Sequence, residues 1–172
     1  MTTDIRHLLE SIENGTPEEA WEAAKQLESF SNEIVSFLLR VLQNGKSEEA
    51  RAAASYVLGF GRYALARTVL EQALNDTRQG AFVRGHAAEA LAYIGDPRST
   101  AVLLNNLKDN EPGVQYWCAF ALGQIGSAQA IPALEDMAER AGGKLYGTHA
   151  LRAEALDAIA KINQHAREGE LP

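Results

Sequence analysis

Two stretches of the chain are near copies of each other at a constant spacing. Residues 83–95 and 114–126 share the same order of apolar and small residues, with an offset of 31 (114 − 83). A fixed period of this length is typical of solenoids, in which stacked helix pairs bury their apolar faces against each other. The period therefore predicts an all-α superhelical solenoid. The matched positions are Val83, Ala90, Leu91, Ile94 and Gly95 with Val114, Ala121, Leu122, Ile125 and Gly126.

The repeat extends towards the N-terminus. Asn14-Gly15 matches Asn44-Gly45 at an offset of 30 (44 − 14). We expect each Asn-Gly pair to end a helix in the left-handed conformation, and Thr16 with Glu19 to form a capping box for the next helix. Apolar residues upstream of both pairs have the i, i+3, i+4, i+7 spacing of one helical face.

The pattern predicts about five helix pairs in one domain, residues 1–163, followed by a frayed tail at 164–172. We denote the two helices of a pair B and A. We expect the B helices to line the inner face of a slightly curved solenoid. The predicted B helices lie near 4–13, 31–43, 63–75, 98–108 and 128–140, and the A helices near 17–29, 48–60, 82–94, 113–125 and 149–163.

Composition narrows the classes of partner. The formal net charge is −7, from 16 basic and 23 acidic residues, so the chain lacks the basic footprint of a nucleic-acid binder. The sequence has neither a signal-peptide layout nor an apolar run long enough to span a bilayer. A single cysteine, Cys118, forms no internal disulfide and favours a reducing compartment. We expect a cytoplasmic protein that binds neither nucleic acid nor membrane.

The segment Val83-Arg84-x-x-Ala87-Ala88-x-Ala90-Leu91-x-x-Ile94-Gly95-Asp96-Pro97 resembles the HEAT-like repeat of the phycobilin-lyase (PBS lyase) type. The resemblance covers most of the chain, and it implies the fold more than the function. It also implies a ladder between repeats, in which a recurrent arginine pairs with an aspartate five or six residues upstream. Asp109 is placed for such a pair, but Gln115 stands where the arginine belongs, so we expect that rung to be absent. The recurrent arginines are Arg51, Arg84 and Arg152.

Candidate chemistry is sparse. His86 and Glu89 superficially resemble the His-Glu pairs with which the HEAT-like deoxyhypusine hydroxylases bind iron, but the adjacent Glu is missing and no other repeat carries such a pair. We therefore expect a structural His86, a buried Cys118 and no catalytic residue, metal or cofactor. Gly142-Gly143-Lys144 lacks the spacing of a phosphate-binding loop.

Three features are candidates for binding a protein partner. The first is a triplet of aromatic residues at positions that are small or polar in the preceding repeat: Tyr116, Trp117 and Phe120 replace Gly85, His86 and Glu89. The three rings are either binding anchors or residues packed on neighbouring repeats, with Gly85 making room for one ring. Six extra residues fall in the loop 141–150, which contains Tyr146 and is either a binding loop or a plain long turn. The third candidate is the set of outward-facing B-helix residues, namely Arg67, Glu71, Asn105, Asn106, Glu135 and Glu139.

These observations favour a non-catalytic protein–protein interaction module, either a scaffold or a binder, that is a monomer or weak oligomer. Three alternatives remain open. The first is a bacterial immunity or antitoxin protein, whose acidic charge would suit a basic toxin. The second is a subunit of the phycobilin-lyase type, and the third is an enzyme with its own metal site.

Overall fold

The computed structural model describes residues 3–27, 34–141 and 148–169. These residues form helices and connecting turns, without a strand in the described ranges. Short 3-10 segments lead directly into three of the helices. The helices are α1 (Thr3–Asn14), α2 (Pro17–Leu27), α3 (Val35–Asn44), α4 (Glu48–Phe60), α5 (Arg67–Asn75), α6 (Ala81–Ile94), α7 (Thr100–Asn106), α8 (Pro112–Ile125), α9 (Ile131–Arg140) and α10 (Thr148–Gly169), and the 3-10 segments are η2 (Ala64–Ala66), η3 (Pro97–Ser99) and η4 (Ala128–Ala130).

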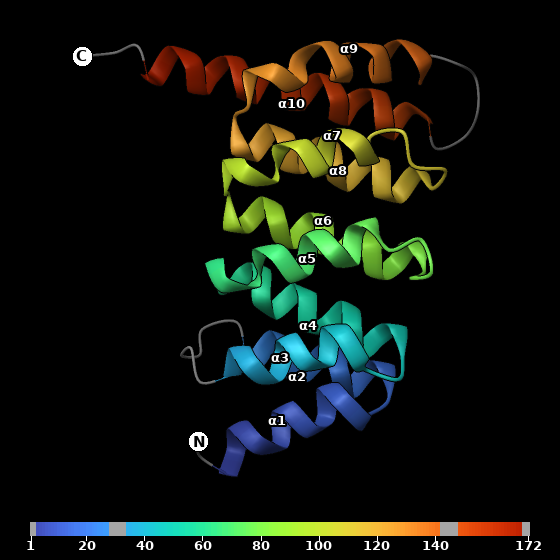
Figure 1. Ribbon diagram of the computed structural model, residues 1–172, viewed down its shortest axis with the longest axis vertical. Coiled ribbons are helices and arrows are strands. Elements are labelled where there is room, and N and C mark those ends of the chain that lie inside the picture. The colour runs from blue at the N-terminus through green and yellow to red at the C-terminus, as the bar shows by residue number, and fades with distance from the viewer. Residues whose placement is uncertain (1–2, 28–33, 142–147, 170–172) are drawn as a thin grey trace.

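The helices stack in two parallel layers along one long axis (Figure 1). The odd-numbered helices form one layer and correspond to the predicted B helices. The even-numbered helices form the other layer and correspond to the A helices. Each helix pair contacts the next pair along the axis, which is the architecture that the 31-residue period predicts.

The A layer is the tightly packed one. Gly59 of α4 lies so close to α6 that a Cβ atom there would be 2.5 Å from the Cα atom of Ala90, and a Cβ at Gly123 of α8 would be 2.8 Å from the Cα of Ala158. Glycine at these two positions therefore lets backbone approach backbone. The B helices contact one another much less than the A helices do.

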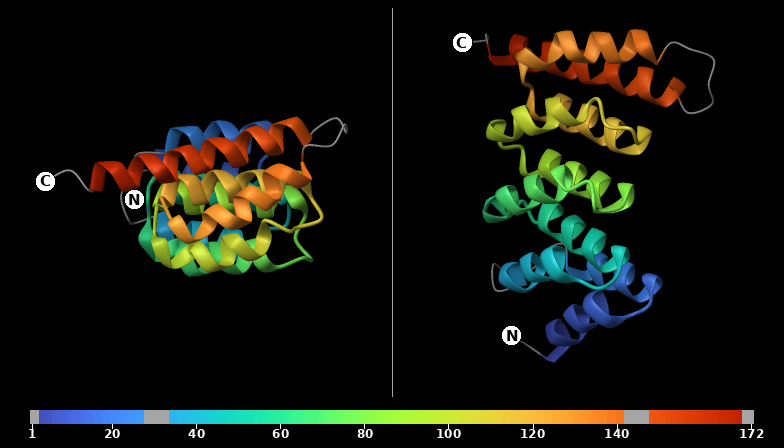
Figure 2. Two further views of the ribbon diagram at one scale, coloured as in Figure 1. Left: turned by 90° about the horizontal axis from the view of Figure 1, so that it is seen from above. Right: turned by 45° about the vertical axis from the view of Figure 1, so that its right-hand side comes forward.

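The inner face is formed by the A helices, so the prediction that B helices line it is wrong. Seen from above, α2 and α10 at the two ends lie further to one side than the A helices between them (Figure 2, left). The layer with the closer helix spacing lies on the inside of the curve, because the inner arc is the shorter one. Small residues at the A–A crossings set that spacing.

The predicted helix ends near 94 and 125 and the predicted capping box are confirmed. Gly95 and Gly126 end α6 and α8 in the left-handed conformation, with φ of 69° and 75°. The Thr16 amide donates to Glu19 (2.8 Å) and the Glu19 amide to Thr16 (3.3 Å), which is the capping box. The prediction of a left-handed glycine is wrong for both Asn-Gly pairs, because neither Gly15 nor Gly45 has a positive φ. Gly45 has φ −58° and ψ 138° and leads in an extended conformation to Ser47, the N-cap of α4.

The C-terminal segment also differs from expectation. Residues 164–169, predicted to be a frayed tail, continue α10 as a helix to Gly169. Their side chains are exposed, whereas Ile162 one turn earlier is buried. Apolar periodicity ends at Ile162, so the sequence pattern could not follow a helix that continues without a buried face. None of the described helices is both long enough and apolar enough to cross a membrane.

Candidate partner-binding surface

The aromatic triplet lies on α8 and is half-buried. Trp117 packs towards α6, where its Cδ1 atom would be 3.2 Å from a Cβ atom at position 85, so Gly85 does make room for the ring. Tyr116 and Phe120 contact Trp117 edge-on, with ring centroids 5.3 and 5.5 Å from it. The three side chains are thus packed against a neighbouring repeat and one another, yet each keeps an exposed part.

The triplet is one end of a much longer series of ring contacts. Phe120 lies 6.4 Å from Tyr93 of α6, measured between ring centroids. Tyr93 lies 4.3 Å from Phe60 of α4, which in turn lies 4.3 Å from Tyr56 on the same helix. Rings from three successive A helices are therefore in continuous contact.

The series continues to the N-terminal end of the A layer. Trp21 of α2 lies 5.7 Å from Tyr56 and 5.1 Å from His86 of α6. Phe82 completes the cluster, 4.7 Å from His86, and is 45% exposed. Four A helices thus contribute to what we call the aromatic row: Trp21, Tyr56, Phe60, Phe82, His86, Tyr93, Tyr116, Trp117 and Phe120.

Sequence reasoning found only one end of this row. Comparing 83–95 with 114–126 in register exposed the triplet, because polar and small residues became rings at matching positions. Tyr56 is equivalent to Phe120, since each lies five residues after the position of the recurrent arginine, but the register was not extended to that repeat. Trp21 and Phe82 occupy other repeat positions, so a register comparison does not find them. The available signal was coarser, namely that aromatic residues concentrate in the predicted A helices.

Carboxylates and a lysine flank the C-terminal end of the row, on α10. The Tyr116 hydroxyl faces Glu154, whose carboxylate raises the pKa of that hydroxyl. The Glu154 side chain is only 8% exposed, and its Oε1 atom has no hydrogen-bond partner. Burial raises the pKa of this carboxyl above its usual value. Lys161 pairs with Asp157 at 2.8 Å and lies 5.2 Å from the centroid of the Phe120 ring.

His86 belongs to the aromatic row and pairs with its own helix. Its Nδ1 atom lies 2.9 Å from Glu89 Oε2, one turn further along α6. Across the described ranges, no cluster of three or more histidine, cysteine, aspartate or glutamate side chains could hold a metal ion. The geometry around His86 is thus that of a packed ring with a hydrogen-bonded partner.

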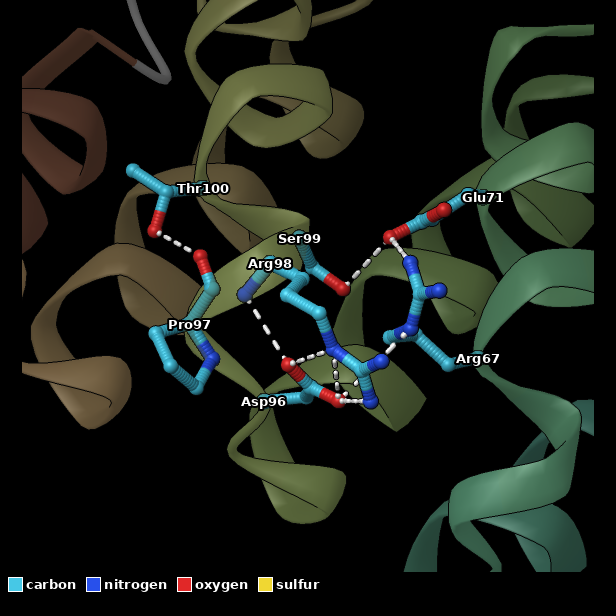
Figure 3. A network of polar contacts seen from close by, with 7 residues as sticks. All are labelled: Arg67, Glu71, Asp96, Pro97, Arg98, Ser99 and Thr100. Carbon is cyan, nitrogen blue, oxygen red and sulfur yellow. Dashed lines mark hydrogen bonds and ion pairs between the residues drawn. The ribbon is translucent and has the colours of Figure 1, made fainter.

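Two of the predicted B-helix site residues are engaged within the protein. Arg67 and Glu71 of α5 form an ion pair at 2.6 Å, and the Ser99 hydroxyl donates to Glu71 at 2.8 Å (Figure 3). Arg67 also lies 3.6 Å from Asp96. Hydrogen bonds from Arg98 lower the pKa of the Asp96 carboxyl to about 2. This network connects α5 to the start of the next repeat.

The other predicted residues are divided between internal contacts and free surface. Asn106 donates to Asn75 of the preceding B helix at 2.8 Å. Asn105, Glu135 and Glu139 are exposed on α7 and α9. Tyr146 and most of the loop 141–150 lie outside the described residues. The structure therefore brings the aromatic triplet into a larger surface, and it does not gather the B-helix residues into one.

The expected arginine–aspartate ladder is found at one of the three recurrent arginines, Arg84, and its direction there differs from the expected one. Arg51 donates to Gln79 at 2.8 Å, and Arg152 donates to the Ala138 carbonyl at 3.4 Å. Arg84 forms a buried ion pair with Asp109, 25 residues downstream in the next repeat. The rung expected to be absent at Asp109 is thus supplied by the preceding repeat, and Gln115 donates to the Asp109 backbone carbonyl. Cys118 lies buried nearby, and burial raises the pKa of its thiol.

Comparison with known proteins agrees with this architecture. Residues 81–145 match the family described as HEAT repeats, and the molecule is an all-α HEAT-like solenoid. Two crystal structures of engineered proteins are similar. The first has a TM-score of 0.63 and 22% sequence identity, and the match covers 94% of this chain and 80% of the engineered chain. The second has a TM-score of 0.52 and 20% sequence identity, and the match covers 95% of this chain and 51% of the engineered chain. Identities this low bear on the fold alone.

A curated relative is an enzyme. Deoxyhypusine hydroxylase-B of Oryza sativa subsp. japonica is 36% identical over 85 residues, which is 49% of this chain. The match spans 28% of the rice protein, so the chain corresponds to less than a third of that relative's length.

Proposed function

We propose that this chain is a non-catalytic protein-binding module and that its partner docks on the inner face of the A helices. The observation that carries the proposal is the aromatic row, a continuous series of half-exposed rings across α2, α4, α6 and α8. We also propose that the repeats of this chain are of the PBS-lyase type. The HEAT repeats support a scaffold of this kind.

Physical chemistry supports the inner face over the outer one. Aromatic side chains offer large contact areas and lose little side-chain freedom on binding, because packing already restricts their rotation. On the B side, Arg67, Glu71 and Asn106 already have internal partners. If these three side chains bound a partner, their internal ion pair and hydrogen bonds would be lost. A partner that covers the rings would break no such contact.

The proposal is tested by comparing two double variants in affinity capture from the native cell, followed by mass spectrometry. Tyr116→Ala/Trp117→Ala removes rings from the inner face, and Glu135→Ala/Glu139→Ala changes exposed residues on α9 of the outer face. We expect the first variant to lose its partner and the second to retain it. Because alanine at 117 leaves a gap against Gly85, Phe82→Ala provides a milder change at the most exposed ring.

Circular dichroism separates binding from folding in these variants. Loss of the partner with unchanged helicity supports the proposal. Retention of the partner by both the double variant and Phe82→Ala, or its loss only in the α9 variant, would reject the inner face as the binding surface.

The other functions predict different observations. An immunity or antitoxin protein would capture a basic toxin and protect cells against it. A subunit of the phycobilin-lyase type would shift the absorbance of a bilin on mixing. The resemblance to deoxyhypusine hydroxylase favours an enzyme with its own metal, which stoichiometric iron or zinc in the purified protein would support. The captured partner would also establish the compartment, which we propose is the cytoplasm.

A further inference from the structure

The helices α8 and α10 meet at a seam in which rings and charged groups lie side by side. Tyr116 and Phe120 come from α8, and Glu154, Asp157 and Lys161 come from α10. Two carboxyl groups face a single ammonium group. When both are ionised, the seam carries surplus negative charge next to aromatic faces.

The seam already attracts a cation from within the chain. The Lys161 ammonium lies 2.8 Å from Asp157 and 5.2 Å from the centroid of the Phe120 ring. The Asp157 side chain is 54% exposed, and exposed ion pairs of this kind contribute little to stability. A cation from another molecule could therefore replace Lys161 on the same carboxylate and ring at small cost.

Glu154 adds a second, less screened negative charge. It is more than nine-tenths buried, faces the Tyr116 hydroxyl and leaves its Oε1 atom without a partner. Charges in such an environment interact more strongly than charges in bulk water. Its charge therefore strengthens the attraction of any cation that reaches Asp157.

We propose that this seam is the subsite for an arginine side chain of the protein partner, an inference that rests on the proposed function. A guanidinium is planar, so it can stack on an aromatic ring while two of its N–H groups pair with a carboxylate. Asp157 supplies the accessible carboxylate and Phe120 the ring. The net charge of −7 is complementary to the basic segment that would carry this arginine.

The probe is an acetylated and amidated peptide of alternating arginine and alanine, titrated into the full chain by calorimetry. Lys161→Met removes the internal competitor, and Lys108→Met makes the same charge change at an exposed site in the turn between α7 and α8. We expect Lys161→Met to bind the peptide about three- to fivefold more tightly than the parent, as expected for an exposed cation–π contact. Lys108→Met should stay within about twofold, because distant exposed charges are screened.

A second pair of variants tests the buried carboxylate. Glu154→Gln should weaken binding about threefold while keeping the shape of the side chain, and Glu139→Gln, on the exposed face of α9, should leave it unchanged. The matching lysine–alanine peptide should bind the parent more weakly, since an ammonium cannot stack and chelate together. A glutamate–alanine peptide should not bind.

Equal effects of the two lysine variants, or of the two glutamate variants, would mean general electrostatic attraction and would overturn the subsite. Equal binding of the lysine and arginine peptides would also overturn it. The proposed function is judged separately: if the native partner is lost in Tyr116→Ala/Trp117→Ala but unaffected by Lys161→Met and Glu154→Gln, the inner face binds a partner and the arginine subsite is wrong.

Discussion

Arg84 and Asp109 form an ion pair in which both side chains are more than 90% buried. Removing one partner leaves the other charge buried without compensation, whereas replacing both by apolar groups does not. We expect Arg84→Met to lower the free energy of unfolding by about 3 kcal/mol, and Arg84→Met/Asp109→Leu to recover most of that loss. Urea denaturation of the single and double variants measures both values; a double variant that is less stable than Arg84→Met would contradict the explanation.

Glu154 gives a pH-dependent prediction. Its pKa is raised in the folded protein above the ordinary value of 4.5, mainly by burial. Stability from such a group is fully present below the unfolded-state pKa and is lost as the pH rises through the folded-state pKa. We therefore expect Glu154→Gln to be about 1 kcal/mol more stable than the parent at neutral pH, because the variant carries no buried charge.

This advantage of Glu154→Gln should shrink as the pH falls towards 4.5, where the carboxyl becomes protonated. Urea denaturation at both pH values tests the prediction. Glu139→Gln is the matched control, since its side chain is exposed, and it should change little at either pH. A gain in stability that is the same at both pH values would show that burial of the charge is not its cause.

At the scale of the helices, the Gly123–Ala158 crossing sets how close α8 and α10 can come. Alanine at 123 would place its Cβ 2.8 Å from the Cα of Ala158, so the two helices must separate. We expect Gly123→Ala to destabilise the protein by about 2 kcal/mol, as overpacking does, despite the better helix propensity of alanine.

Gly113 in the first turn of α8 provides the control for this substitution. A Cβ atom there has nothing within 4 Å, and its φ is not positive. Gly113→Ala should therefore leave stability unchanged or raise it by up to about 1 kcal/mol. Thermal unfolding of the two variants tests the pair; equal effects would mean that helix propensity, and not the crossing, determines the outcome.

The helices themselves could be predicted from the sequence, whereas their assembly into a curved surface could not. The prediction of a helix over 48–60 agrees with α4, and Gly95 and Gly126 end α6 and α8 as expected. Periodicity reports which side of a helix is buried, but not which layer lies inside the curve. That depends on how closely the layers pack, which becomes visible only when Gly59 meets Ala90 in space.

Part of the candidate site could likewise be predicted from the sequence, and part could not. The triplet Tyr116, Trp117 and Phe120 stood out because a neighbouring repeat offered a direct comparison. Trp21 joins the row from a different repeat position, and it meets His86 only because α2 and α6 approach each other across the inner face. Contacts between side chains of non-equivalent positions are set by the stack, and a comparison of repeats cannot give them.

For the molecule as a whole, stability should vary along the axis. Each pair of helices contacts mainly its neighbours, so the central repeats are supported on both sides and the terminal ones on one side. We expect backbone amides of α4, α6 and α8 to show the slowest hydrogen exchange, and those of α1 and of α10 beyond Ile162 the fastest. Uniform protection of all helices would contradict this and indicate a single cooperative unit.

The contrast between the two layers has a mechanical consequence. Backbone-to-backbone crossings make the A layer nearly inextensible, while the sparse contacts between B helices leave the outer layer free to open or close. Bending of the stack should then pivot about the A layer, as a beam bends about its neutral axis. We expect the distance between neighbouring rings of the aromatic row to stay constant while the curvature of the solenoid changes. A partner would then meet rings at fixed distances on a surface whose curvature can adapt.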